Sequence, residues 1–307
     1  MSVPVLTWAD LPHRELTYDP GLLSLRWTFG CGQAFRWRDA GGGWWTGVVS
    51  GCAIRLRTEG DRIVYASYPD ISAGFWSEYL RLDFDLARMY AELGAIDSHA
   101  ARAFERWPGL RLLRQDPLET VTTFICTTAN TIPRIIRAVE GMSRVWGRHI
   151  ATIEGTDYHA FPSPQVFSAA CISALERDCN LGYRSRVLVR AMEVIVSLPE
   201  GWAASLRDAP YAEAQAELMR LPGVGPKVAD CVCVFALDKD EAVPVDTHIR
   251  QIAIDLYLPE MAQRSLTTNT YNRIAGAFRD RFGERAGWVQ QYLFYSHLMR
   301  HRDMPVL

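Results

Sequence analysis

The sequence predicts an α+β protein, with a β-rich N-terminal domain at residues 1–116 and a helical domain at residues 117–307. In the first third of the chain, short segments such as 33–38 and 52–57 alternate apolar and polar residues, which is typical of half-buried strands. From about Phe75 the apolar residues fall three and four apart, as on an amphipathic helix. The composition changes near Asp116 and Pro117, and we therefore place the domain boundary there.

The elements follow in order from these patterns. Glycine-containing turns at 41–43 and 59–61 separate the predicted strands. The segment 75–93 is the first long predicted helix, and helices then continue almost to the end of the chain. The later predicted helices are Pro117–Thr128, Ile132–Val145, Tyr183–Val196, Tyr211–Leu221, Pro226–Leu237, Thr247–Tyr257, Tyr271–Phe282 and Arg285–Met299.

The composition excludes several classes of protein. No apolar run is long enough for a membrane span, and the N-terminus lacks the pattern of a secretory signal. Seven scattered cysteines indicate a reduced, intracellular protein without disulfides, and no cysteine spacing predicts a metal site, so we expect no metal and no cofactor. The net charge of −2 argues against coating nucleic acid through bulk positive charge, and any DNA binding must therefore be local. Neither terminus carries a basic cluster, which favours a prokaryotic cytoplasm or nucleoid over a nucleus.

The most informative stretch is the turn Leu221-Pro-Gly-Val-Gly225 between two predicted helices. Its glycines permit tight or left-handed backbone, and Pro226 suits the first position of the second helix. This pattern predicts a helix-hairpin-helix, whose turn and helix-start amides can bind a DNA phosphate without reading sequence. The alternative is an ordinary helical corner, since glycine and proline are common between helices.

Lys227 and Asp246 are the candidate catalytic residues. Lys227 lies in the first turn of a helix, where a cation is disfavoured, and a lysine nucleophile needs the uncharged amine. Asp246 in Val-Pro-Val-Asp-Thr-His is a predicted N-cap, and a carboxylate held there can stabilise positive charge on a sugar that is losing its base. The alternatives are a solvated or phosphate-binding lysine and a purely structural cap.

The hairpin sequence and Val-Pro-Val-Asp-Thr-His resemble the helix-hairpin-helix glycosylases with a Gly/Pro-rich loop and an aspartate. Within that superfamily, the chain resembles the 8-oxoguanine DNA glycosylase/AP lyases. The resemblance is carried by Gly30-Cys-Gly-Gln-Ala-Phe-Arg-Trp37, Arg111-Leu-Leu-Arg-Gln-Asp-Pro117, Phe124-Ile-Cys126, Leu181-Gly-Tyr-Arg184, residues 221–230, Gly287-Trp-Val-Gln290 and Leu293-Phe294. It implies a twisted antiparallel N-terminal sheet followed by a helical glycosylase domain. It also implies that Lys227 attacks C1′, forms an imine with the sugar and nicks the strand by β-elimination, while Asp246 assists departure of the base.

The resemblance also implies a base pocket. Cys231 lies one turn after Lys227, and Phe294 lies one turn after Gln290, so each helix presents two side chains to one site. Cys231 and Phe294 would sandwich the extruded base, and the amide of Gln290 would bond its Watson–Crick edge. The backbone carbonyl of Gly32 would read the N7–H that oxidation at C8 creates. Core packing for Cys231 and Phe294, and a turn between strands for Gly32, are the alternatives.

Further residues match DNA contacts of the family. Tyr183 matches the residue that wedges into the vacated stack, and Arg184 and Arg134 match arginines that read the orphaned cytosine. Asn130, His248 and the turn glycines Gly223 and Gly225 are likewise expected to contact DNA.

Two positions depart from the family. Ala129 stands where the family commonly carries an asparagine that touches the cytosine, and we predict weaker discrimination of the opposite base. His297 stands where the family carries an acid that partners the histidine matching His248.

Three other functions are weighed against this interpretation. An alkyl-base glycosylase of the same superfamily lacks the lysine, and an iron–sulfur relative needs cysteines after Cys233, where this chain has none. A non-catalytic DNA-binding module would use the hairpin only as a phosphate clamp. We therefore expect a monomer that acts on double-stranded DNA containing oxidised guanine, without a membrane partner.

Overall fold

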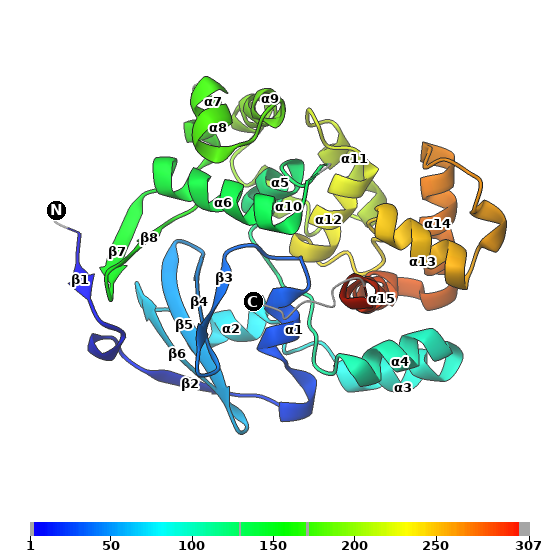
Figure 1. The fold of residues 1–307 in the computed structure, drawn as a ribbon, viewed down its shortest axis with the longest axis horizontal. Coiled ribbons are helices and arrows are strands. Elements are labelled where there is room, and N and C mark those ends of the chain that lie inside the picture. Colours follow the sequence, from blue (N-terminus) through cyan, green and yellow to red (C-terminus); the bar gives the residue numbers. More distant parts are fainter. Residues whose placement is uncertain (1–2, 129, 170–171, 301–307) are drawn as a thin grey trace.

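The computed structural model describes residues 3–128, 130–169 and 172–300. A five-stranded antiparallel sheet lies at the N-terminal end, in the order β2-β6-β5-β4-β3, and helices make up most of the remainder (Figure 1). The predicted α+β fold with an N-terminal antiparallel sheet is confirmed. The five strands are β2 (Arg14–Thr17), β3 (Trp37–Gly41), β4 (Trp44–Val49), β5 (Cys52–Glu59) and β6 (Arg62–Tyr68).

Glycine turns set the register of this sheet. Gly42 and Gly43, between β3 and β4, have φ values of 58° and 78°, and Gly60, between β5 and β6, has a φ of 60°. Hairpin turns of this kind need positive φ, which glycine adopts without steric cost. Trp45 consequently pairs with Leu56, and Leu56 with Tyr65.

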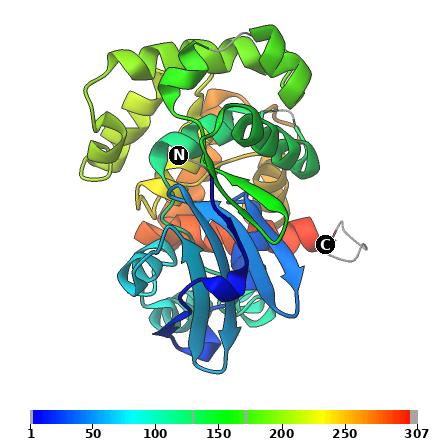
Figure 2. The ribbon, with the colours of Figure 1, turned by 90° about the vertical axis from the view of Figure 1, so that its left-hand side faces the viewer.

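Both faces of the sheet are covered. On one face, Leu56 and Tyr65 belong to a buried cluster with Trp76 and Tyr79 of α2 (Ala73–Tyr79). On the other face, Ala53 packs with Ile150 of a second sheet. That sheet has the order β1-β7-β8 and contains β1 (Val5–Leu6), β7 (His149–Ile153) and β8 (Thr156–His159). Figure 2 shows the β7–β8 hairpin beside the larger sheet, with α7, α8 and α9 above.

Each predicted helix after residue 116 has a counterpart in the structure. Those present in the described residues are α1 (Leu25–Gly30), α2, α3 (Leu86–Ile96), α4 (Ser98–Arg106), α5 (Pro117–Ile125), α6 (Ile132–Trp146), α7 (Pro164–Ser168), α8 (Ile172–Cys179), α9 (Arg184–Ser197), α10 (Trp202–Ser205), α11 (Tyr211–Met219), α12 (Pro226–Ala236), α13 (Thr247–Leu256), α14 (Thr268–Phe282) and α15 (Ala286–Arg300). The helices α1, α4, α7, α8 and α10 lie outside the predicted ranges. Residues 228–236 of α12 are all buried, so this helix runs through the centre of the helical core.

Three further details differ from the sequence-based expectation. The predicted helix 75–93 is two helices, α2 and α3, because Arg81 takes a φ of 50° and Asp85 caps a new helix at Arg88 N. The predicted strand 33–38 begins only at Trp37. Gln33 lies in a buried loop, where its side-chain amide donates to the carbonyls of Thr28 and Arg111, both at 2.8 Å. The β7–β8 hairpin was not predicted, because its strands have only five and four residues and carry no clear alternation.

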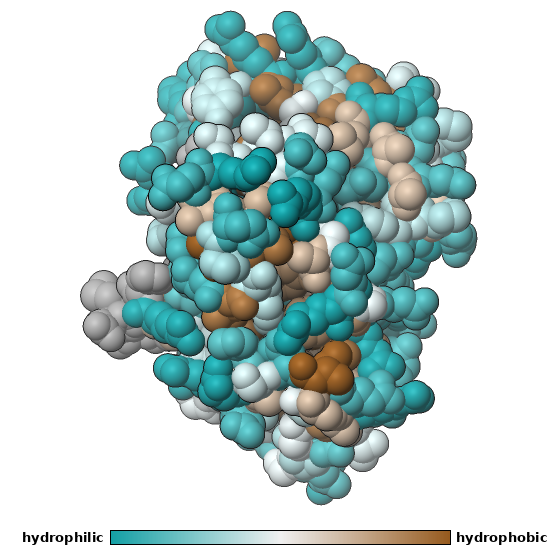
Figure 3. Space-filling model, turned by 90° about the vertical axis from the view of Figure 1, so that its right-hand side faces the viewer, coloured by the Kyte–Doolittle hydropathy of each residue, from teal (hydrophilic) through white to brown (hydrophobic). Residues whose placement is uncertain are grey.

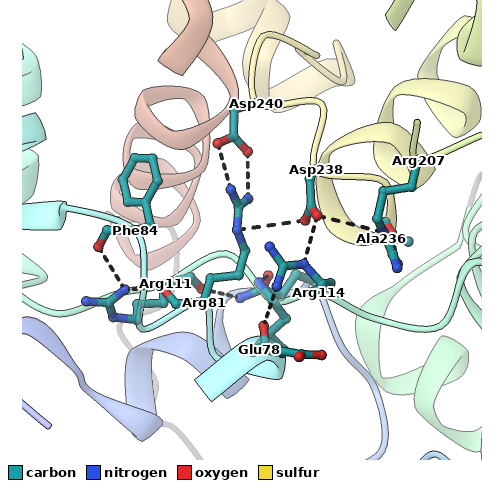
Figure 4. A network of polar contacts seen from close by, with 11 residues as sticks. Glu78, Arg81, Phe84, Arg111, Arg114, Arg207, Ala236, Asp238 and Asp240 are labelled. Carbon is teal, nitrogen blue, oxygen red and sulfur yellow. Dashed lines mark hydrogen bonds and ion pairs between the residues drawn. The ribbon is translucent and has the colours of Figure 1, made fainter. Parts of the chain in front are cut away.

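An ionic network joins the N-terminal part of the chain to the loop between α12 and α13 (Figure 4). The guanidinium of Arg81 donates to both carboxylate oxygens of Asp240, at 2.6 and 2.8 Å, and Arg114 donates to Asp238 at 2.7 Å. The side chains of Arg81 and Asp240 are only 7% and 17% exposed. This loop is therefore held firmly where it leads from Lys227 towards Asp246. The domain boundary at residue 116 stays a prediction.

The face that carries α13 and α14 is mostly hydrophilic, with apolar residues in scattered patches (Figure 3). Among the residues described, no helix combines the length and the apolar character that a membrane span requires.

Candidate active site

The predicted hairpin is formed by α11 and α12. Gly223 has a φ of 79°, and a Cβ placed on it would collide with Cγ1 of Val187, so glycine is required at this position. Gly225 is the N-cap of α12 and supplies no side-chain cap, and Pro226 follows as the first helical residue. The first amides of α12 are therefore left without a side-chain partner, which suits an anion.

Lys227 is half-buried at the start of α12. Its Nζ donates to Oγ1 of Thr127 at 3.1 Å and lies 5.2 Å from the centre of the Phe124 ring. The hydroxyl of Thr127 donates in turn to the carbonyl of Phe124 at 2.7 Å, which leaves its lone pairs directed to the amine. The amine is thus held by residues from the end of α5.

Asp246 is the N-cap of α13, as predicted. Its Oδ1 accepts a hydrogen bond from Ile249 N at 2.8 Å, which fixes the carboxylate at the helix start. Lys227 and Asp246 both line one cavity of about 810 Å³. This volume falls in the range of small-molecule and base pockets. The structure therefore brings together the two residues that the sequence singled out.

Two of the four predicted base-contacting residues line the same cavity. Gly32 and Phe294 both line it, and a Cβ on Gly32 would lie 3.8 Å from Cε1 of Phe294. Gln290 and Cys231 are not among the lining residues and are buried, each 3% exposed. The Oε1 atom of Gln290 is buried and has no hydrogen-bond partner within the described part of the chain. Burial raises the pKa of the Cys231 thiol to about 12, although the nearby Lys227 opposes this shift, and Cys231 is therefore an uncharged thiol.

The predicted DNA-contacting residues are more spread out. Asn130, Gly223, Gly225 and His248 line the cavity. Tyr183 is 60% exposed at the start of α9, which leaves its ring accessible.

The two arginines predicted to read cytosine differ in their surroundings. The Arg184 guanidinium lies 4.6 Å from the ring centre of Tyr183 and donates from Nε to the carbonyl of Thr128 at 2.8 Å. Arg134 is exposed on the first turn of α6. Ala129 falls outside the described residues.

His248 contacts His297 at the edge of the cavity. Their Nδ1 atoms are 3.2 Å apart, so one imidazole donates and the other accepts. The His248 ring also meets Phe294 edge to face, with ring centres 5.6 Å apart. His297 therefore does occupy the position of a partner to His248.

Sequence reasoning missed Thr127, Tyr271 and Asp230. Thr127 and Tyr271 line the cavity, and Asp230 is fully buried one turn after Lys227. Burial raises the pKa of Asp230 to about 6, against the opposing effect of three side-chain hydrogen bonds. The sequence signal for these residues was the acid Asp230 inside the apolar run 228–236. An acid that is buried there needs buried hydrogen-bond partners.

A hairpin that presents a lysine to the same cavity as a helix-capping aspartate is the arrangement of the helix-hairpin-helix DNA glycosylases. Three comparisons agree with this class. The family model described as 8-oxoguanine DNA glycosylase, N-terminal domain, matches residues 16–121. The N-glycosylase/DNA lyase OGG1 of Arabidopsis thaliana is 35% identical over 96% of this chain and 80% of its own length. The probable N-glycosylase/DNA lyase of Methanothermobacter thermautotrophicus is 29% identical over 81% and 83%.

A solved structure is similar over the whole fold. The Clostridium acetobutylicum 8-oxoguanine glycosylase/lyase, in complex with double-stranded DNA containing cytosine opposite 8-oxoG, superposes with a TM-score of 0.81. It is 28% identical and covers 91% of this chain and 92% of its own. The chain belongs to the family of 8-oxoguanine DNA glycosylase/AP lyases.

Proposed function

We propose that the protein flips 8-oxoguanine out of double-stranded DNA, excises it through a covalent intermediate on Lys227, and nicks the resulting abasic strand. One observation carries the proposal: Lys227 and Asp246, from different helices, line the same cavity as Gly32 and Phe294. The relatives' names and the DNA-bound structure of the Clostridium enzyme support the same reaction and substrate. Action on DNA implies an intracellular enzyme.

The first step is displacement of the base. The uncharged amine of Lys227 attacks C1′ of the extruded nucleotide, the C1′–N9 bond breaks, and the base leaves with its electron pair and takes up a proton. Positive charge develops on the sugar, and the carboxylate of Asp246 stabilises it from a fixed position. Thr127 holds the Lys227 amine before DNA arrives, since it accepts a hydrogen bond from Nζ at 3.1 Å.

The second step cleaves the strand. The amine adduct opens the sugar ring and becomes an imine between Nζ and C1′. Loss of a proton from C2′ then expels the 3′-phosphate, which is β-elimination. The strand on the 5′ side keeps the sugar as an unsaturated imine on Lys227 until water hydrolyses it, whereas the expelled strand leaves with the phosphate at its 5′ end.

Recognition of the lesion uses the wall of the cavity. The carbonyl of Gly32 accepts the N7–H of 8-oxoguanine, Phe294 and Cys231 pack on the two faces of the base, and Gln290 bonds its Watson–Crick edge. The unpartnered Oε1 of Gln290 supports this role, because an unpaired buried acceptor is costly unless a ligand satisfies it. Arg184, Arg134, Tyr183 and Asn130 contact the opposite strand and the gap. The amides at Gly223 and Gly225, with His248, contact phosphates.

Borohydride trapping tests the proposal. Wild-type protein incubated with a duplex containing 8-oxoguanine and sodium borohydride should become covalently attached to the DNA, because hydride reduces the imine. The variant Lys227→Gln should bind the duplex but form no adduct and release no base. Free base without any adduct from the wild type would mean hydrolysis rather than covalent catalysis.

A further inference from the structure

Asp230 is a buried acid that the proposed reaction does not use. It is 0% exposed on α12, one turn after Lys227. Tyr211 and Gln215 of α11 donate to its Oδ1 at 2.8 and 2.6 Å. Tyr271 of α14 donates to its Oδ2 at 2.5 Å. Asp230 therefore joins both helices of the hairpin to α14.

Tyr271 also contacts the loop that carries Asp246. Its hydroxyl oxygen accepts a hydrogen bond from Val245 N at 3.3 Å, at the residue immediately before Asp246. A phenol has one proton, and the 2.5 Å contact assigns it to Asp230 rather than to the carbonyl of Val243 at 3.3 Å. The Tyr271 side chain is 6% exposed and also lines the cavity.

These contacts connect the two proposed catalytic residues through one hydroxyl. Lys227 lies in the first turn of α12, Asp246 caps α13, and Tyr271 comes from α14. The Tyr271 hydroxyl contacts both Asp230 of α12 and Val245. We propose that Tyr271 is a positioning residue, whose hydroxyl holds the end of the 242–246 loop in a fixed relation to the helix of Lys227. This proposal rests on the proposed function above.

The physical reason is geometric. Displacement at C1′ needs the attacking amine and the stabilising carboxylate on the same sugar, and a misplacement of about 1 Å can cost about 100-fold in rate. The cap bond from Ile249 N orients the carboxylate within α13 but does not tie α13 to α12. The hydrogen bonds from Tyr271 to Asp230 and from Val245 N to Tyr271 supply that connection between buried residues.

The chain offers a matched control. Tyr211 donates a phenol to the same Asp230 carboxylate, but it comes from α11 and its hydroxyl is bonded to Gln215 rather than to the 242–246 loop. Tyr271→Phe and Tyr211→Phe therefore each remove one donor from Asp230, and only the first releases Val245 N. A purely structural role for the tyrosines predicts similar effects from both variants.

The experiment compares the two variants in single-turnover excision of 8-oxoguanine from a duplex, with DNA affinity and melting temperature measured beside the rate. Tyr271→Phe should excise about 10- to 100-fold more slowly than the wild type with unchanged DNA affinity, whereas Tyr211→Phe should stay within about threefold. Excision by Tyr271→Phe at the wild-type rate, or equal loss in both variants, overturns the proposal.

Asp230→Asn keeps the side-chain volume and weakens the hydrogen bond that Asp230 accepts from Tyr271. It should slow excision in the same direction, again with unchanged DNA affinity. Wild-type excision by Asp230→Asn would also overturn the proposal. Wild-type protein on the same duplex separates the two proposals, because its failure to excise would refute the proposed function and not the positioning role alone.

Discussion

Replacement of Gly223 by alanine should weaken both the fold and DNA binding. Gly223 has a φ of 79°, and a Cβ added there would collide with Val187 of α9. The left-handed backbone costs an L-residue about 1–2 kcal/mol, and overpacking adds about 1–3 kcal/mol. The free energy of unfolding should therefore fall by about 2–5 kcal/mol. If the turn moves to relieve the clash, loss of one amide–phosphate bond should raise the DNA Kd about tenfold.

Gly155 offers a control that separates the cost of the left-handed backbone from the cost of overpacking. Its φ is 80°, and a Cβ placed on it would meet no atom within 4 Å. Gly155→Ala should therefore lose only about 1–2 kcal/mol, with unchanged DNA affinity. The double variant Gly223→Ala with Val187→Ala should recover the stability lost to overpacking and keep the loss that comes from the left-handed backbone.

Urea unfolding and fluorescence anisotropy with a labelled duplex measure these two effects. The reasoning is refuted if Gly223→Ala and Gly155→Ala lose the same stability while both retain wild-type DNA affinity.

Three further predictions concern other parts of the chain. Arg81→Met leaves the carboxylate of Asp240 without its bidentate partner and should lower the free energy of unfolding, measured in urea, by about 3–5 kcal/mol. The double variant Arg81→Met with Asp240→Leu should recover most of this lost stability. A loss below about 1 kcal/mol in the single variant would contradict this. Burial raises the pKa of Asp230 to about 6 from 3.8, so the folded state holds this proton more tightly than the unfolded state. The contribution of Asp230 to stability is therefore full below pH 3.8 and lost as the pH rises through about 6. Asn does not titrate, so the melting temperature of the wild type should fall relative to that of Asp230→Asn over this pH range. A difference between the two proteins that does not change with pH would count against this assignment. Excision opposite each of the four bases should show a weak preference, because Ala129 replaces the asparagine common in the family, and a strict preference for cytosine would contradict this sequence-based prediction.

Local sequence signals determined the hairpin and the two candidate catalytic positions. Glycine at a left-handed turn position, proline at the first residue of α12 and aspartate at the N-cap of α13 each act within a few residues of the chain. Such effects can be read from a sequence, because the interacting groups are close neighbours along it. The resemblance to the glycosylase family then supplied the predictions of a base pocket and of DNA contacts, which stay predictions.

The prediction from local sequence patterns was wrong where contacts with residues distant in the chain determine the backbone conformation. The helix expected at 75–93 breaks near Arg81, whose guanidinium pairs with Asp240, a residue 159 positions away. Gln33 leaves the expected strand because its amide serves the carbonyl of Arg111, which is 78 positions away. Neither partner is visible in the local sequence.

Tertiary structure alone decided how the site is assembled. The sequence singled out Lys227 and Asp246, but the contact of Lys227 with Thr127 spans 100 positions, and that of Tyr271 with Val245 spans 26. A buried donor or acceptor must find a partner wherever the fold places one. The residues that hold the amine and the carboxylate in place are therefore set by packing between helices, for which neither periodicity nor capping provides a signal.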